Sequence, residues 1–371
     1  MNVLIYFPYN QRTVEQQSVI EMFIKHGHRV FLLTLSAQGT LHQIASALGA
    51  TCLASSKGEN LNIKNVFNNA RLLIKTCKKH QINLVLAHQQ VCGLPLIIAQ
   101  TFIKCPAYYI RHNTDEGYAS NPAKARILNG IINRFSKKII APSDIVFNFL
   151  QKREGVHTNK IRRINYGYNF EQYEKPDNNI VESIKEEFSA SLLIVSVARL
   201  VEAKRHIKMF SVVQELVKNG LDIKIICLGS GILKTVLEKW IAVNKMEHNI
   251  YLLGMKSNVI DYLSAGDLLL HLSETEASNS VVKEAGLVKK AAIVCKGVGD
   301  FEDYIEHYVN GFLTEKEHPE KETLNILRAM YHNKSQLEQI GIIAQQTITS
   351  VFDIKNVELS YLNLLNYDEV Q

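Results

Sequence analysis

The stretch Asp267-Leu268-Leu269-Leu270-His271-Leu272-Ser273-Glu274-Thr275-Glu276-Ala277-Ser278-Asn279-Ser280-Val281-Val282-Lys283-Glu284-Ala285-Gly286 decides how the chain folds. It opens with a run typical of a short buried strand, and from Val281 onward apolar residues recur at helical spacing. Ser278 or Asn279 can cap that helix. The stretch therefore predicts a strand, a loop that carries Glu276, and a helix that carries Glu284. In α/β proteins, such a loop and the first amides of the helix hold a phosphate.

The two carboxylates of this stretch are the candidates for chemistry. Glu276 falls in the predicted loop, and Glu284 lies on the helix, where its oxygens could accept hydrogen bonds from a sugar diol. Taken alone, two glutamates at this spacing are more often part of a solvated helix face than of a site. A second pattern elsewhere in the chain is needed to favour a binding site.

That second pattern is an apolar run, Leu192 to Ala198, which has the length of a strand. It leads into Arg199-Leu200-Val201-Glu202-Ala203-Lys204-Arg205, just before a helical segment near His206 to Lys218. Arg199 and Lys204 would lie at the carboxyl end of a parallel strand, where cations can grip a pyrophosphate. The alternative is a basic loop that is simply exposed to water.

Together the two patterns resemble family 4 glycosyltransferases, which are retaining enzymes that use nucleotide sugars and have the two-lobed GT-B fold. The segment from Ser196 to Lys204 is similar to the family's donor-diphosphate loop, which implies that Arg199 and Lys204 bind the donor phosphates. The segment from Glu276 to Glu284 is similar to the family's E-x7-E motif. This implies that Glu276 lies beside the donor sugar and that Glu284 binds the ribose.

The resemblance implies further donor contacts in the second half of the chain. Val298-Gly299-Asp300-Phe301-Glu302 is similar to the family's glycine-rich turn, although the usual paired glycines are split here as Gly297 and Gly299. Asn310-Gly311-Phe312-Leu313 also fits the family. The predicted donor-binding set is completed by residues of the helix start and by a glycine after another strand: Ser278, Asn279, Ser280, Val281 and Gly229.

In the first half of the chain the resemblance is thinner. Tyr109-Ile110-Arg111-His112-Asn113 follows a predicted strand and is similar to the family's histidine-bearing loop, so His112 is expected to contact the donor sugar or the catalytic centre. A single histidine is also common as a structural residue. At its start the chain departs from the family's glycine-rich turn and has Phe7-Pro8-Tyr9-Asn10-Gln11-Arg12, where Asn10 and Arg12 are the candidates for acceptor contacts.

Strands and helices alternate along both halves of the chain, which predicts parallel sheets. The predicted fold class is α/β, with two doubly wound Rossmann-like domains that face each other across a cleft. The expected domains are residues 1–170 and 171–350, and residues 351–371 are expected to form a helix that packs back on the first domain. A length of 371 residues suits two domains. The expected strands lie near Val3 to Phe7, Arg29 to Thr34, Asn83 to Ala87, Ala107 to Ile110, Lys138 to Ala141, Lys160 to Ile164, Leu192 to Val197, Ile223 to Leu228, Ile250 to Leu253, Leu268 to Leu272 and Ala291 to Val294.

Charge is distributed unevenly between the two halves. Residues 1–180 hold 22 Lys and Arg against 10 Asp and Glu, a net +12, and the rest of the chain carries 20 minus 26, or −6. A basic domain attracts an anionic membrane surface, an acidic polysaccharide or nucleic acid. A membrane surface is the preferred interpretation, and a merely soluble basic surface is the alternative. Nucleic acid is disfavoured because no aromatic-interleaved basic motif or zinc spacing accompanies the charge.

The remaining composition favours a cytoplasmic protein, peripheral on the inner face of the membrane. Met1 to Phe7 shows a strand pattern without a basic leader, and no uninterrupted apolar run approaches about 18 residues. The six cysteines form no C-x-x-C pair and are expected to be reduced core residues.

The resemblance implies transfer of a sugar with retention of anomeric configuration. A UDP-sugar is the favoured donor and a GDP-sugar the next, and the acceptor would be a glycan or a lipid-linked saccharide in cell-surface polysaccharide, lipopolysaccharide or glycolipid synthesis. A clamp of Arg and Lys removes the need for a divalent ion, so no metal and no other cofactor is expected. The alternatives are a sugar-nucleotide epimerase on the same fold, an exported sugar-binding protein, and a non-catalytic scaffold.

Overall fold

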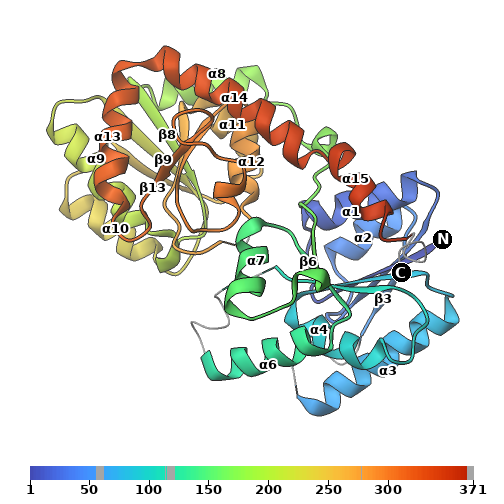
Figure 1. Ribbon diagram of the computed structural model, residues 1–371. Coiled ribbons are helices and arrows are strands. Elements are labelled where there is room, and N and C mark those ends of the chain that lie inside the picture. Colours follow the sequence, from blue (N-terminus) through green and yellow to red (C-terminus); the bar gives the residue numbers. More distant parts are fainter. Residues whose placement is uncertain (56–61, 113, 115–121, 277, 366–371) are drawn as a thin grey trace. The chain divides into compact units, whose positions relative to one another are not determined.

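The computed structural model describes residues 1–55, 62–112, 114, 122–276 and 278–365 of the chain (Figure 1). Its contacts divide the chain into two compact units. The first unit comprises Met1–Gln172 together with the C-terminal segment from Phe352, and the second comprises Tyr173–Val351. Each unit is built on a parallel sheet of the Rossmann-like type, as the alternation of strands and helices predicts.

The sheet of the first unit has seven parallel strands in the order β3-β2-β1-β4-β5-β6-β7. The chain builds the sheet outward from β1 in one direction and then from β4 in the other, so the strand order reverses between β1 and β4. In open parallel sheets, ligands bind beyond the carboxyl ends of the strands at such a reversal. The strands are β1 (Asn2–Phe7), β2 (Arg29–Thr34), β3 (Thr51–Ala54), β4 (Leu84–His88), β5 (Ala107–Ile110), β6 (Lys138–Ala141) and β7 (Ile161–Arg163).

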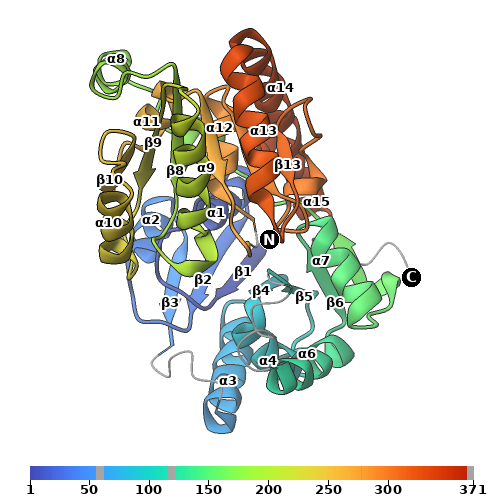
Figure 2. The same cartoon turned by 90° about the vertical axis from the view of Figure 1, so that its left-hand side faces the viewer.

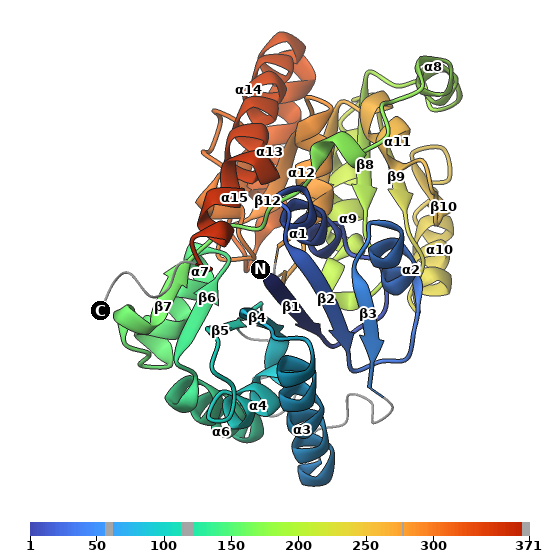
Figure 3. The same cartoon turned by 90° about the vertical axis from the view of Figure 1, so that its right-hand side faces the viewer.

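Helices cover both faces of this sheet (Figures 1 and 3). One apolar core joins the sheet to α1 (Val14–Lys25), α2 (Thr40–Ala47) and the C-terminal α15 (Ile354–Leu362). The other core joins it to α3 (Ile63–Lys79), α4 (Gln89–Ala99), α6 (Pro122–Phe135) and the short α7 (Asp144–Asn148). Ile354, Val357 and Tyr361 of α15 are buried against the first unit, so the C-terminal helix returns to it as expected.

The sheet of the second unit has six parallel strands in the order β10-β9-β8-β11-β12-β13. Here the reversal lies between β8 and β11, which are hydrogen-bonded neighbours. The loops that leave the carboxyl ends of these two strands are therefore the ones expected to hold a ligand. The strands are β8 (Leu192–Val197), β9 (Ile223–Leu228), β10 (Ile250–Gly254), β11 (Leu268–His271), β12 (Ala291–Cys295) and β13 (Phe312–Thr314).

The helices of the second unit also lie in two layers (Figure 2). On one face α9 (His206–Lys218) packs against α10 (Lys234–Val243) and α13 (Pro319–His332). On the other face α11 (Val259–Ala265) packs against α8 (Asn178–Glu187) and α12 (Ser280–Leu287), and α14 (Lys334–Phe352) lies beside α12. The α12–α14 contact is close, because a Cβ on Gly286 would come within 2.6 Å of the Ile348 side chain.

Two observed strands, β3 and β13, were not expected from the sequence. Both are short edge strands, and β3 is only partly buried, so neither shows a long apolar run. All six cysteines are free thiols. Within the described residues, no helix is long and apolar enough to cross a membrane.

Candidate active site

The loop between β11 and α12 places Glu276 at the strand-order reversal of the second unit. β11 ends at His271, and α12 begins after Asn279, whose Oδ1 accepts a hydrogen bond from the Val282 backbone N–H at 3.1 Å. Of the two predicted caps, Asn279 is therefore the one that caps the helix. The predicted order of strand, loop and helix is confirmed here, and Ala277 lies outside the described residues.

The Glu276 carboxylate is held by three nitrogen atoms that all contact the same oxygen, Oε1. Lys204 Nζ forms an ion pair with it, His271 Nε2 lies at 2.6 Å, and Asn279 Nδ2 donates at 3.1 Å. The Glu276 side chain is only 12% exposed. Burial alone would raise its pKa, but the bonds and charges of His271 and Lys204 outweigh burial and lower the pKa to about 2. Glu276 is thus a fixed anion at neutral pH.

The loop after β8 carries both predicted diphosphate-binding cations. Lys204 is largely buried and, besides Glu276, donates to Ser273 Oγ at 3.3 Å. Arg199, in contrast, is exposed. The structure therefore brings Lys204 and Glu276 together across the β8–β11 boundary, although they are 72 positions apart in the chain. It leaves the Arg199 guanidinium at the surface of the same loop.

Gly229 supports this loop from the neighbouring strand. It follows β9 with φ at +137°, and a Cβ there would lie 2.0 Å from the Ala198 carbonyl oxygen. Only glycine allows this close approach between the two loops. Gly299, also a predicted donor-binding residue, is buried and has φ at +57°, a conformation that likewise favours glycine.

Ser278 belongs to a buried ionic network at the start of α12. Its Oγ donates to Asp300 Oδ2 at 2.6 Å and accepts a bond from Lys283 Nζ at 2.8 Å. Lys283 and Asp300 form an ion pair at 2.9 Å, with side chains 0% and 1% exposed. Ser278 therefore links the site loop to the body of the unit.

The other predicted residues of α12 lie along its first turns. Ser280 and Val281 are its first two residues, and the backbone N–H groups of a first helical turn have no partner within the helix. These groups point toward the helix start, where an anion is favoured. Glu284 lies one turn further along and is partly buried. The helix start and Glu284 thus keep the spacing along α12 that the sequence predicts.

His112 lies in the first unit, in a chain of buried hydrogen bonds. Its Nε2 lies 2.9 Å from His88 Nδ1, and its Nδ1 lies 2.7 Å from the Tyr166 hydroxyl. His88 Nδ1 also lies 3.3 Å from Gln16 Nε2. Burial lowers the pKa of His112 to about 4, so its ring is neutral at pH 7. Both ring nitrogens are engaged by the chain itself, so a ligand would have to displace one of these bonds.

Sequence reasoning missed the side chains that support the site. His271, the last residue of β11, could have been suspected because a histidine that ends a buried strand at a reversal faces the ligand edge. Lys283 and Asp300 give no such signal, since a lysine within a helix is usually exposed. His88 ends β4 and His112 follows the neighbouring β5, so their position at the carboxyl edge follows from the parallel register.

Comparisons with known proteins identify the family of the chain. The family description "Glycosyl transferases group 1" matches residues 179–347, and "Glycosyltransferase Family 4" matches residues 17–172. The first match spans both loops of the site and α12. The chain belongs to the family 4 glycosyltransferases. The two matched segments correspond to the two observed units.

Solved structures of glycosyltransferases share this fold over nearly the whole chain. A crystal structure of the Anabaena protein HepE in complex with UDP is 18% identical, with a TM-score of 0.84 over 99% of this chain and 100% of that one. A glycosyltransferase from Rickettsia africae is 18% identical, with a TM-score of 0.81 over 98% of this chain and 97% of that one. These likenesses establish the GT-B type of fold for this glycosyltransferase.

Two curated relatives are similar in sequence over part of their length. The poly(ribitol-phosphate) alpha-N-acetylglucosaminyltransferase of Staphylococcus aureus is 23% identical over 186 residues, which are 50% of this chain and 38% of that protein. An uncharacterized glycosyltransferase of Methanocaldococcus jannaschii is 25% identical over 232 residues, 57% of this chain and 55% of that protein. The chain thus spans 38% of the first relative and 55% of the second, less than two thirds of either.

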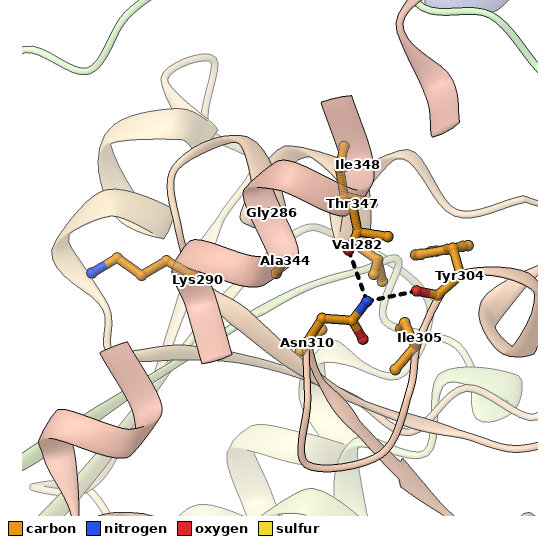
Figure 4. A pocket seen from close by; sticks show the side chains of 10 residues that line it. Val282, Gly286, Lys290, Tyr304, Ile305, Asn310, Ala344, Thr347 and Ile348 are labelled. Atoms are coloured by element: carbon orange, nitrogen blue, oxygen red, sulfur yellow. Dashed lines mark hydrogen bonds between the residues drawn. The ribbon is translucent and has the colours of Figure 1, made fainter. Parts of the chain in front are cut away.

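A small pocket of the second unit is part of the packing and not of the site (Figure 4). It lies between α12, α14 and the turn before β13, and its lining is mostly apolar. Asn310 donates through Nδ2 to the Tyr304 carbonyl at 2.8 Å and to Thr347 Oγ1 at 3.0 Å. The Asn310-Gly311 pair that fits the family thus ties this turn to α14.

Proposed function

We propose that this glycosyltransferase transfers a sugar from a UDP-sugar, with a GDP-sugar as second choice, to a glycan or a lipid-linked saccharide with retention of configuration. The observation that carries the proposal is the meeting of Lys204 and Glu276 at the β8–β11 reversal, with Arg199 exposed on the same loop as Lys204. Two cations, an open helix start and a fixed carboxylate are what a nucleoside diphosphate sugar requires. The structures of HepE with UDP and with UDP-glucose support the choice of nucleotide.

The proposed mechanism follows from where charge develops. Cleavage of the anomeric C–O bond adds one negative charge to the diphosphate, which already carries two, and leaves a positive charge on the sugar ring. Arg199, Lys204 and the first amides of α12 would stabilise the diphosphate. Glu276 would stabilise the ring cation, and Glu284 would orient the ribose. The leaving phosphate would take the acceptor proton on the same face, which gives retention without a protein nucleophile.

No metal is needed in this proposal, because Arg199 and Lys204 supply the positive charge that a divalent ion would otherwise provide. The test is a turnover screen of the folded chain with UDP-, GDP-, ADP- and CDP-sugars, with and without EDTA. We expect release of one nucleoside diphosphate at a rate that EDTA does not change. A new sugar nucleotide formed without acceptor would instead identify an epimerase, and no turnover with any donor would favour a scaffold.

One helix layer of the first unit carries exposed apolar residues that mark a candidate interaction surface. On α6, Ile127, Ile131 and Phe135 are 63%, 38% and 60% exposed, and their spacing of four residues puts them on one face. The opposite face of α6 is polar in part, because Asn129 and Asn133 each donate to Glu154 at 2.7 Å. The helix thus buries one apolar face, which includes Ile132, and also presents a second apolar stripe outward, where an ordinary surface helix is polar.

α3 carries a similar stripe in the same layer, and both helices pack against α4 (Figure 1). Ile63 and Phe67 are 78% and 49% exposed, and the stripe continues with Arg71 and Lys75. Between Asn62 and Lys138 the sequence holds twelve Lys and Arg against two acidic residues. Arg111 is buried and paired with Glu154, and the other eleven basic residues are Lys64, Arg71, Lys75, Lys78, Lys79, Lys104, Lys124, Arg126, Arg134, Lys137 and Lys138.

We further propose that this α3–α6 face binds an anionic membrane surface and makes the enzyme peripheral on the inner face of the membrane. Exposed apolar residues set among cations are the composition of an interfacial helix, and the positive charge complements anionic lipid. A second copy of the chain that docked through the same face would not supply that complementary charge, since it would bring the same basic residues. Contact with a membrane would give access to a lipid-linked acceptor.

Vesicle flotation tests this face. The chain is expected to float with vesicles that contain phosphatidylglycerol at low salt, to float less at high salt, and not to float with neutral vesicles. The triple change of Ile127, Ile131 and Phe135 to Ser should abolish flotation. The matched control changes Ile232, Val236 and Val243, which are 87%, 50% and 72% exposed in the second unit. Flotation that ignores salt, or equal loss in both triple variants, would contradict the proposed face.

A further inference from the structure

The bonds to Glu276 are distributed unequally between its two oxygens. Lys204, His271 and Asn279 all contact Oε1, and no described residue forms a hydrogen bond to Oε2. A carboxylate can accept bonds at both oxygens. Oε2 is therefore the oxygen available to a ligand, while Oε1 is held by the three contacts within the protein.

The three groups that contact Glu276 Oε1 would respond differently when a donor binds. Lys204 is the predicted partner of the donor diphosphate, so binding of the donor competes for its ammonium group. Asn279 is neutral, and its amide orientation is fixed because Oδ1 accepts from the Val282 N–H. His271 is 2% exposed at the end of β11, and its ring lies nearly perpendicular to that of Phe301, with 6.3 Å between the ring centroids. His271 is thus held by the sheet and cannot follow the ligand.

If the Lys204 ammonium group turns to the diphosphate, the Glu276 carboxylate loses its ion pair. Another group must then hold the carboxylate in place. The Glu276 side chain is only 12% exposed, so the desolvation of its carboxylate is no longer balanced when the charge partner leaves. The 2.6 Å contact from His271 Nε2 is the shortest remaining one, and a charge-assisted bond of that kind is strong. The Asn279 amide alone, at 3.1 Å, supplies no charge.

We infer that His271 is a positioning residue for Glu276: it holds Oε1 when Lys204 turns to the donor diphosphate, so that Oε2 stays directed at the sugar. The inference rests on the proposed function for the identity of the ligand. The clamp itself, which is the contact of Lys204 and His271 with Glu276 Oε1, does not depend on the proposed function.

The surroundings of His271 are compatible with this role. The charged group next to it is the Glu276–Lys204 ion pair, and the nearest titratable neighbour on α9 is His206. His206 is 2% exposed, and neither of its ring nitrogens has a hydrogen-bond partner in the described part of the chain. Burial, followed by the charges of His271 and Lys204, lowers the pKa of His206 to about 4. His206 is therefore neutral at pH 7 and adds no positive charge beside His271.

Turnover of the donor tests the positioning role. We expect His271→Leu to lower kcat roughly 10- to 100-fold, the value of one charge-assisted bond, with little change in KM for the donor or in the Kd of UDP. His271→Gln keeps an N–H donor at a similar reach and should recover most of the rate. Equal rates in the Leu and Gln variants, or a loss confined to UDP affinity, would overturn the inference.

A stability cycle tests the clamp without any nucleotide. The free energy of unfolding is measured for Lys204→Met, His271→Leu and the double variant. If both groups hold Oε1, the double variant should lose more than the sum of the two single losses, and Glu276→Gln should remove this coupling. Additive losses would overturn the clamp. Coupling in a chain that neither binds UDP nor turns over a donor would retain the clamp and reject the proposed function.

Discussion

Lys283→Met is expected to lower the free energy of unfolding by about 3–5 kcal/mol, because it leaves the buried Asp300 carboxylate without its charge partner. Both side chains are essentially inaccessible to solvent, and Asp300 would keep only the Ser278 hydroxyl among the bonds described above. The measurement is chemical denaturation of the variant beside the wild type. The double variant Lys283→Met with Asp300→Asn should recover part of the loss, since no buried charge then remains unpaired.

The matched control for this prediction is Lys296→Met. Lys296 pairs with Glu315 at 2.7 Å, but the two side chains are 42% and 62% exposed. An exposed pair contributes at most about 1 kcal/mol. Similar losses for Lys283→Met and Lys296→Met would mean that the buried pair does not hold the start of α12 as described.

Glu276→Gln is expected to lower turnover about 100-fold or more, with the fold and the affinity for UDP retained. The change removes the negative charge that would stabilise the sugar cation, and removal of one such electrostatic contact commonly costs two to three orders of magnitude. Because the pKa of Glu276 is about 2, the carboxylate is ionised at any ordinary assay pH. A loss of turnover in Glu276→Gln would therefore reflect removal of the negative charge and not a change in the protonation of Glu276.

The control for Glu276→Gln lies in the same loop. Glu274 pairs with Arg205 at 3.3 Å, but its side chain is 53% exposed. Glu274→Gln should leave turnover close to that of the wild type. Wild-type turnover in Glu276→Gln, or equal losses in the two variants, would remove Glu276 from the proposed chemistry.

The depressed pKa of Glu276 also has a consequence for stability. A carboxyl group with a lowered folded-state pKa contributes stability above its unfolded value, here 4.5, and loses that contribution as the pH falls toward 2. The difference in free energy of unfolding between the wild type and Glu276→Gln should therefore become smaller as the pH falls from 4.5 toward 2.

Much of the fold follows from local pattern. The apolar runs of β8 and β11 predict buried parallel strands, and their carboxyl ends locate Lys204 and Glu276 at one edge of a sheet. The edge strands β3 and β13 escape this reasoning because neither carries a long apolar run and β3 is only partly buried. Short strands owe their conformation to neighbours in the sheet more than to their own sequence.

The supporting partners of the site could not be predicted in the same way. That His271 meets Glu276 depends on the path of the loop between them, and that Lys283 is buried depends on Asp300 from the next loop. His112 was predicted as a ligand contact, but its two nitrogens are engaged by His88 and Tyr166. Contacts that depend on tertiary packing leave no periodic signal in the sequence.

The central claim is that the loops after β8 and β11 hold a nucleoside diphosphate without a metal. The most direct test is titration of UDP into the EDTA-treated chain and into Lys204→Ala, with Lys208→Ala as control, since Lys208 pairs with Glu320 away from Glu276. The account predicts that UDP binds the wild type and Lys208→Ala alike and binds Lys204→Ala at least about tenfold more weakly. Equal affinity in all three proteins, or no binding by the folded wild type, would contradict it.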